Sequence, residues 1–100
     1  MIFDAVHNYY EQMVYDEIRK TLTKEGIAES PDFLEDVACV ALNRLPTRYI
    51  RHRIDLAFYM TSDERERMEF SVRDAVYHAL DYVMRRLRED NRFRAPNSPE

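Results

Sequence analysis

The chain has 100 residues, of which 45% are hydrophobic and 34% charged, and its formal net charge at pH 7 is -4. This length suits one small domain with a thin core, so a second copy would supply buried area and we expect a homodimer. The acidic balance lacks the broad cationic surface that holds nucleic acid by counterion release, so we do not expect a nucleic-acid partner.

The first residues of the chain bear on its cellular location, and its single cysteine bears on disulfide and zinc bonding. Met1 to Asp4 lack the basic start of a secretory signal, and no window approaches the about 18 apolar residues of a membrane span. We therefore expect a cytoplasmic protein without membrane contact. Cys39 is alone, which excludes an internal disulfide and a cysteine-rich zinc site.

Two amphipathic helices are predicted in the first half of the chain. Apolar residues at spacings of three and four predict a helix over 4–25, and Gly26 can end it. Ser30 is expected to cap the N-terminus of a second helix over 31–45, with Pro31 as its first residue, and Pro46 ends this helix. Cys39 lies among Val37, Val40 and Ala41 and is expected in the core.

A third and longest helix is predicted over 62–89. Thr61 and Glu64 form a capping box, and apolar residues recur at helical spacing as far as Leu87. Residues 91–100 contain two prolines and little apolar content, which predicts a disordered tail. The domain organisation is one helical domain over 1–90 and a tail over 91–100.

The segment from Thr47 to Met60 suits two structures. Ile50, Ile54 and Phe58 recur as in a helix, whereas apolar residues also alternate as in a strand. The β-branched residues after Pro46 favour a strand over about 48–54. A lone strand leaves backbone groups unpaired, so we expect it to pair with the same strand of a twin subunit. The fold class is thus mainly α, with three principal helices and one short strand.

Four arginines gather in the ten residues from Arg44 to Arg53, together with His52 and without an acidic residue. Positive charge concentrated at one place in an acidic chain favours a local pocket for a small anion. Two structural roles are equally open for this block. The arginines could discourage edge-to-edge aggregation of an exposed strand, or pair with acidic residues of the last helix.

The order of these motifs resembles the late-competence ComFB family. The matching residues are His7-Asn8-Tyr9-Tyr10-Glu11, the stretch Asp36 to Pro46 with its Ala-Leu-Asn-Arg-Leu-Pro string, and Arg48-Tyr49-Ile50. The resemblance covers about the first 60 residues, and the string ending at Pro46 is its most specific part. It implies a mostly helical, non-enzymatic homodimer. For some members it implies a receptor for a cyclic dinucleotide such as cyclic di-GMP. Zinc is not carried over, because this chain lacks the cysteine cluster of competence-type members.

The chemistry of a cyclic dinucleotide fits the residues after Pro46. Arginine forks clamp phosphate, pair with guanine O6 and N7 or stack on the base, Tyr49 offers a ring, and Asp55 can accept from guanine N1 and N2. On a strand Tyr49, Arg51, Arg53 and Asp55 would share one face. The candidate ligand-binding residues are Arg44, Arg48, Tyr49, Arg51, His52, Arg53 and Asp55.

Four polar residues upstream can form either a polar site or a structural hydrogen-bond network. Asn8 and Glu11 lie one helical turn apart, and Asp36 and Asn43 lie two turns apart, so each pair can face one direction. For Asn43 we prefer the structural role. Metal binding is not expected, because His7, His52 and His78 are scattered.

The sequence therefore predicts a non-enzymatic receptor without a cofactor. Gly26 is the only glycine, so a glycine-rich phosphate loop is absent, and no serine or cysteine has a plausible histidine partner. The predicted ligand is a cyclic dinucleotide, with cyclic di-GMP preferred, and a downstream protein partner would read the bound state. The alternative is a homodimeric adaptor that binds no ligand and only contacts another protein.

Overall fold

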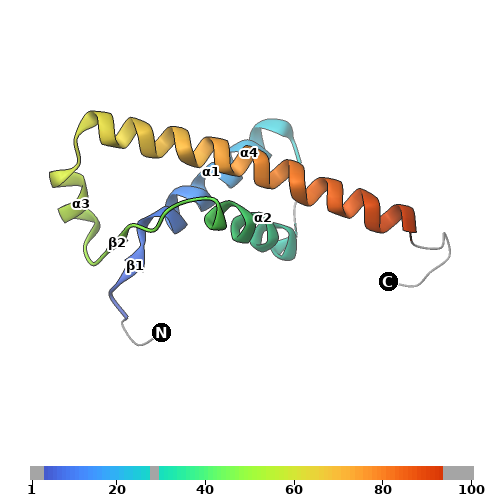
Figure 1. Cartoon of the computed structure of the whole chain (residues 1–100), viewed down its shortest axis with the longest axis horizontal. Helices are drawn as coiled ribbons and strands as arrows, with labels where there is room; N and C mark the ends of the chain where they lie inside the picture. The colour runs from blue at the N-terminus through green and yellow to red at the C-terminus, as the bar shows by residue number, and fades with distance from the viewer. Residues whose placement is uncertain (1–3, 28–29, 94–100) are drawn as a thin grey trace.

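The computed structural model describes residues 4–27 and 30–93, with the side chains of 53, 55, 57 and 91–93 left out. Two short strands and four helices follow in the order β1 (His7–Asn8), α1 (Tyr9–Glu25), α2 (Pro31–Asn43), β2 (Tyr49–Ile50), α3 (Arg53–Tyr59) and α4 (Ser62–Phe93). In Figure 1, α4 lies along the long axis of the molecule, and α3 lies next to the N-terminal end of α4. The predicted mainly α fold class is confirmed.

The last residues of α1, α2 and α4 and the first residues of α2 and α4 lie within four residues of the predicted positions. Gly26 adopts a left-handed φ of 69° and its N–H bonds to carbonyls of the last turn of α1. Ser30 caps α2, accepting the Phe33 N–H at 3.2 Å, and Thr61 accepts the Glu64 N–H at 3.1 Å at the start of α4. α4 runs to Phe93 rather than to 89, and the remainder of the predicted tail, 94–100, lies outside the described residues.

The core lies where α1, α2 and α4 meet. Ile18 is 1% exposed and Val37 and Ala79 are fully buried, which confirms the helical periodicity. Leu87 belongs to the same predicted pattern but is 47% exposed, because the last turns of α4 extend beyond the other helices (Figure 1). The buried cluster comprises Tyr10, Val14, Ile18, Leu22, Val37, Ala41, Met68, Val72, Ala75, Val76, Ala79 and Val83.

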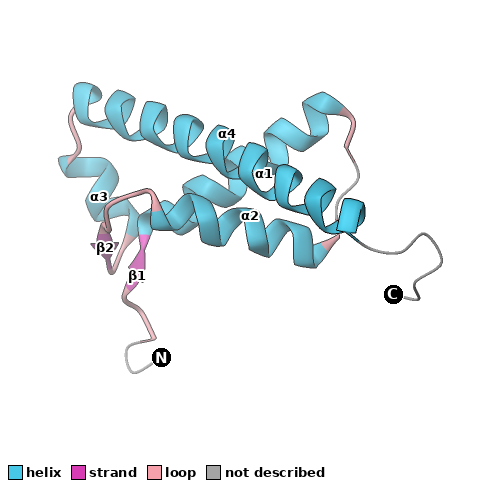
Figure 2. Cartoon of the chain, turned by 45° about the vertical axis from the view of Figure 1, so that its right-hand side comes forward, coloured by secondary structure: helices cyan, strands magenta, loops and turns pink. Residues whose placement is uncertain are grey.

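The two strands form an antiparallel pair within one chain. His7 pairs with Ile50 and Asn8 with Tyr49. The magenta arrows in Figure 2 mark the two strands. The expectation that the strand near Ile50 has no partner in its own chain is therefore wrong, and with it the reason for pairing it with a twin subunit. Helix α1 begins at Tyr9 and not at residue 4, which leaves β1 extended and free to supply the missing backbone partners.

The ambiguous segment contains both predicted structures in succession. The strand ends at Ile50 instead of residue 54, and the backbone turns into α3 at Arg53. Leu56 is buried in α3, whereas Ile54, Phe58 and Tyr59 are 76%, 81% and 79% exposed. The alternation of apolar residues after Ile50 therefore belongs to a short helix, in which Leu56 is the one buried residue among the side chains that the structure describes.

Cys39 is exposed, so its predicted place in the core is wrong. At about 100° per residue it lies about 200° away from both Val37 and Ala41, on the opposite side of α2. Val37 and Ala41 are the residues that α2 buries completely. Among the described residues, no helix has the length and apolar content needed to cross a membrane.

Candidate functional site

Asn8 joins the beginning of α1 to the segment that follows Pro46. Its Oδ1 atom accepts the N–H of Tyr10 at 3.3 Å, which caps α1, and the N–H of Arg48 at 2.9 Å. The N–H of Tyr9 donates to the Arg48 carbonyl at 2.8 Å. These bonds and the β1–β2 pair fix the backbone of Arg48 beside α1.

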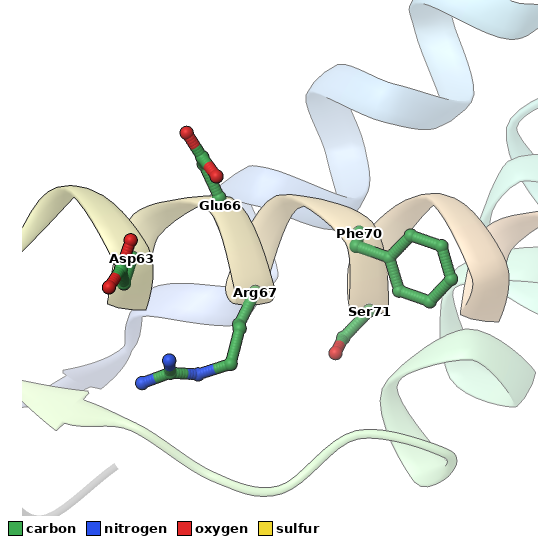
Figure 3. A pocket seen from close by; sticks show the side chains of 5 residues that line it. All are labelled: Asp63, Glu66, Arg67, Phe70 and Ser71. Atoms are coloured by element: carbon green, nitrogen blue, oxygen red, sulfur yellow. The ribbon is translucent and has the colours of Figure 1, made fainter.

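A surface hollow of about 440 Å³ lies between this segment and α4. Two cations, Arg48 and Arg67, and the Glu64 carboxylate line this hollow, which we call the Arg48–Arg67 hollow. In Figure 3, Arg67 reaches from α4 toward the chain that leads into β2. The other lining residues of the hollow are Tyr10, Pro46, Thr47, Met68 and Ser71.

Arg48 and Glu64 form an ion pair in this hollow. Arg48 Nη1 lies 2.9 Å from Glu64 Oε1, and the two side chains are 43% and 29% exposed. For Arg48 the pair confirms the structural role in which the arginine block contacts acidic residues of the last helix, since Glu64 belongs to α4. An anion that binds Arg48 must therefore compete with this carboxylate.

Tyr10 also lines the Arg48–Arg67 hollow and is 6% exposed. Burial raises the pKa of its hydroxyl above the ordinary 10.0, Arg48 lowers it and Glu64 raises it again. The phenol is therefore neutral at physiological pH and adds no charge to the hollow.

A second hollow of about 260 Å³, the β2–α3 hollow, lies on the other side of Arg48. Arg51 and His52 come from the turn between β2 and α3, and both are exposed. Tyr49 and Tyr59 supply two aromatic rings. The complete lining is Arg48, Tyr49, Ile50, Arg51, His52, Leu56 and Tyr59.

The structure brings together four of the seven predicted ligand residues, namely Arg48, Tyr49, Arg51 and His52, around the β2–α3 hollow. Arg44 is exposed at the end of α2 and lines neither hollow. The predicted common face of Tyr49, Arg51, Arg53 and Asp55 is wrong, because Arg53 and Asp55 lie on the backbone of α3. Their side chains lie outside the described residues.

The four upstream polar residues do not form one site. Asn8 caps α1 from outside the helix, so it does not share a helical face with Glu11, which is exposed in the first turn. Asn43 donates from Nδ2 to the Cys39 carbonyl at 2.9 Å, which is a structural role. Asp36 is exposed on α2.

Sequence reasoning missed Tyr10, Tyr59, Glu64 and Arg67 as lining residues. Glu64 already has a role as the third helical residue after its cap, and Arg67 is one of many charged residues on α4. Only the return of the chain through α3 brings these two residues over Arg48. Among the described residues, no three His, Cys, Asp or Glu side chains are grouped as a metal site requires.

The fold and these hollows define a small helical protein with an arginine-lined surface, formed by Arg48, Arg51 and Arg67. This surface lies beside the antiparallel pair of β1 and β2, which we call the β1–β2 clip. The family model described as late competence development protein ComFB matches residues 7–87. The chain belongs to the ComFB family. A comparison with curated proteins finds no match.

Proposed function

We propose that this protein is a non-enzymatic, cytoplasmic receptor for a cyclic dinucleotide, with cyclic di-GMP as the preferred ligand. The proposal rests on one observation: Arg48 and Arg67 border the same hollow as the Glu64 carboxylate. Arginine pairs with guanine O6 and N7, and a carboxylate accepts hydrogen bonds from the guanine N1 and N2 edge. Glu64 takes the acceptor role that the sequence assigned to Asp55.

The β2–α3 hollow supports the rest of the ligand in this proposal. Arg51 and His52 offer N–H donors to phosphate oxygens, and Tyr49 and Tyr59 offer rings for a second base. The larger hollow falls within the roughly 300–1,000 Å³ usual for small-molecule sites, whereas the smaller hollow of about 260 Å³ falls below it. A ligand lying across Arg48 would use both.

Binding requires Arg48 to exchange Glu64 for the ligand. The Arg48–Glu64 pair is partly exposed, and an exposed pair contributes only about 0–1 kcal/mol to stability. Exchange is therefore a small cost. Because Tyr59 ends α3, the bound ligand would also change the surface that α3 offers to a downstream protein.

Titration calorimetry with cyclic di-GMP tests the proposal on the intact chain and on two arginine variants. We expect one ligand per chain, and Arg48→Ala should weaken binding by about tenfold or more, as loss of a charge-assisted contact does. Arg44→Ala is the matched control, because Arg44 belongs to the same block but lines neither hollow. Absence of heat with the intact protein would overturn the proposal.

A ligand-free adaptor is the second candidate, and the outer side of α3 favours it. Ile54, Phe58 and Tyr59 are more than three-quarters exposed on one short helix, and exposed apolar patches mark protein contacts. A thermal-shift screen with cyclic di-GMP, cyclic di-AMP and ordinary nucleotides separates the two candidates. A ligand at 100 times its dissociation constant stabilises a fold by about 2.7 kcal/mol. No shift with any nucleotide supports the adaptor.

A further inference from the structure

Helix α3 carries three apolar side chains that the rest of the chain hardly covers. Ile54, Phe58 and Tyr59 are each more than three-quarters exposed, and the rings of Phe58 and Tyr59 pack edge to face with their centroids 5.6 Å apart. Leu56 is buried and lies about 200° around the helix from Ile54 and Phe58, so those two side chains point outward. In Figures 1 and 2, α3 lies at one end of the molecule. We call these three exposed residues the α3 tip.

Basic side chains lie beside the α3 tip. Arg51 and His52 are exposed in the turn before α3, and both line the β2–α3 hollow together with Tyr59. Among the described side chains, Arg51 has no ion-pair partner. From Arg44 to Thr61 the only acidic residue is Asp55, although the whole chain has a net charge of -4. The tip therefore joins apolar side chains to the basic part of an acidic protein.

Carboxylates at the start of α4 limit this positive charge. Asp63 and Glu66 are exposed and come four and seven residues after Tyr59. Glu64 is already paired with Arg48. The attraction of the tip for an anionic surface is therefore modest, and its apolar side chains have to supply most of the binding.

We infer that the α3 tip binds the surface of an anionic phospholipid membrane, with Ile54 and Phe58 inserted between the headgroups and the acyl chains. Apolar side chains bind at this boundary, and cations beside them are attracted to the anionic lipids. Arg51 and His52 offer N–H donors to lipid phosphates, and Tyr59 combines an apolar ring with a polar hydroxyl. The sequence-based expectation of no membrane contact rested on the lack of a signal and of a spanning segment, and a surface contact needs neither.

The small size of the α3 tip favours a membrane over a protein partner. A stable protein contact buries about 800 Å² on each side, whereas one aromatic side chain buries only about 150–250 Å². Phe58, Tyr59 and Ile54 together therefore fall short of a protein interface. A membrane sets no such minimum, because binding to its surface grows with the inserted apolar area and with the attraction to anionic lipids.

A tryptophan placed at the tip reports its insertion directly, because the chain itself contains no tryptophan. Phe58→Trp is the reporter, and Phe70→Trp is the matched control, since Phe70 is also exposed but lies on α4 (Figure 3). With vesicles of phosphatidylcholine mixed with phosphatidylserine, the emission of Phe58→Trp should shift to shorter wavelength and that of Phe70→Trp should stay unchanged. Vesicles of phosphatidylcholine alone should bind the chain more weakly, because they do not attract the basic side chains.

Sedimentation of the full chain with the same anionic vesicles measures the affinity. Phe58→Ser should lower it by about tenfold or more, because burial of a large apolar side chain is lost, and Phe70→Ser should leave it unchanged. Arg51→Ala should lower it by about fivefold, as expected for one cation near an anionic surface. Arg88→Ala, at an exposed position near the other end of α4, is the control for charge. Circular dichroism should show unchanged helix content in every variant.

The inference does not rest on the proposed function, because Ile54 and Phe58 line neither the Arg48–Arg67 hollow nor the β2–α3 hollow. Phe58→Ser should therefore bind cyclic di-GMP as the intact chain does. Failure of the intact chain to sediment with anionic vesicles would overturn the inference, as would equal emission shifts in the two tryptophan variants or binding that Phe58→Ser leaves unchanged. If another protein or a second copy covers the α3 tip instead, the first of these outcomes is expected.

Discussion

Asn8 and Arg48 lie forty residues apart in the sequence, and the Asn8 side-chain oxygen accepts the Arg48 backbone N–H at 2.9 Å. The same oxygen accepts the Tyr10 N–H and caps α1. One side chain therefore both caps α1 and helps to hold the backbone of Arg48 beside it.

Asn8→Ala should lower the free energy of unfolding by about 1–2 kcal/mol, because replacing a helix cap with alanine typically costs about 0.5–2 kcal/mol and Arg48 loses its acceptor as well. Asn8→Asp keeps the oxygen and should retain most of the stability. Urea denaturation measures both variants. An equal loss of unfolding free energy in Asn8→Ala and Asn8→Asp would show that the side-chain oxygen does not provide the stabilisation.

The same substitution at two isoleucines should separate the core from α3. Ile18 is 1% exposed and Ile54 is 76% exposed. Ile18→Ala should cost about 2–5 kcal/mol by leaving a cavity, and Ile54→Ala should stay within about 0.5 kcal/mol. Denaturation midpoints provide the comparison, and a large loss at Ile54 would mean that α3 is covered in solution.

The buried phenol of Tyr10 should make stability depend on alkaline pH. Its pKa is raised in the fold, so the unfolded chain releases this proton first as pH rises above about 10. The contribution is fully present below that pH and is lost above it, so the free energy of unfolding falls. Tyr10→Phe should remove this part of the fall, whereas Tyr77→Phe, at an exposed position, should leave it in place.

The Glu64 carboxylate should set the base preference if the proposed function is correct. Glu64→Gln retains an acceptor but adds donors, so the preference for cyclic di-GMP over cyclic di-AMP should narrow by about tenfold, as expected for one good base contact. Asp63→Asn is the control, since Asp63 does not line the Arg48–Arg67 hollow. Calorimetry with both ligands gives the ratio for each variant. An unchanged ratio would remove Glu64 from base recognition.

Cys39 should react with a thiol reagent in the folded protein, because its side chain is exposed on α2. The native and the denatured chain should differ little in labelling rate. Cys39→Ser should change the free energy of unfolding by less than about 0.5 kcal/mol. Strong protection of the native thiol would contradict the observed exposure.

The long helices could be predicted because their signals are local. Gly26, Ser30 with Pro31, and Thr61 mark helix ends through bonds within a few residues. The prediction that Cys39 is buried was wrong because it relied on the apolar residues next to Cys39 in the sequence. Adjacent residues of a helix point in different directions, so Val37 and Ala41 are buried while Cys39 is exposed. The strand near Ile50 was found but extended too far, because the same residues suit a helix once the chain turns at Arg53.

The candidate site could be predicted only in part, because some of its residues come together through tertiary contacts that leave no local signal in the sequence. Arg48, Tyr49 and Arg51 stand out as a block of unusual composition. Glu64 and Arg67 have ordinary places on α4, and only tertiary contact brings them to Arg48. The partner of β2 was missed because a two-residue strand such as β1 leaves no periodic pattern.

The clip between β1 and β2 has a consequence for the order of folding. It joins residues about forty positions apart in the sequence through only a few hydrogen bonds. Contacts between distant residues form later than contacts between residues close in sequence, because closing a long loop costs more chain entropy. We expect α1 and α2 to dock before the clip forms. The arginine-lined surface would then be completed last during folding and opened first under mild denaturation.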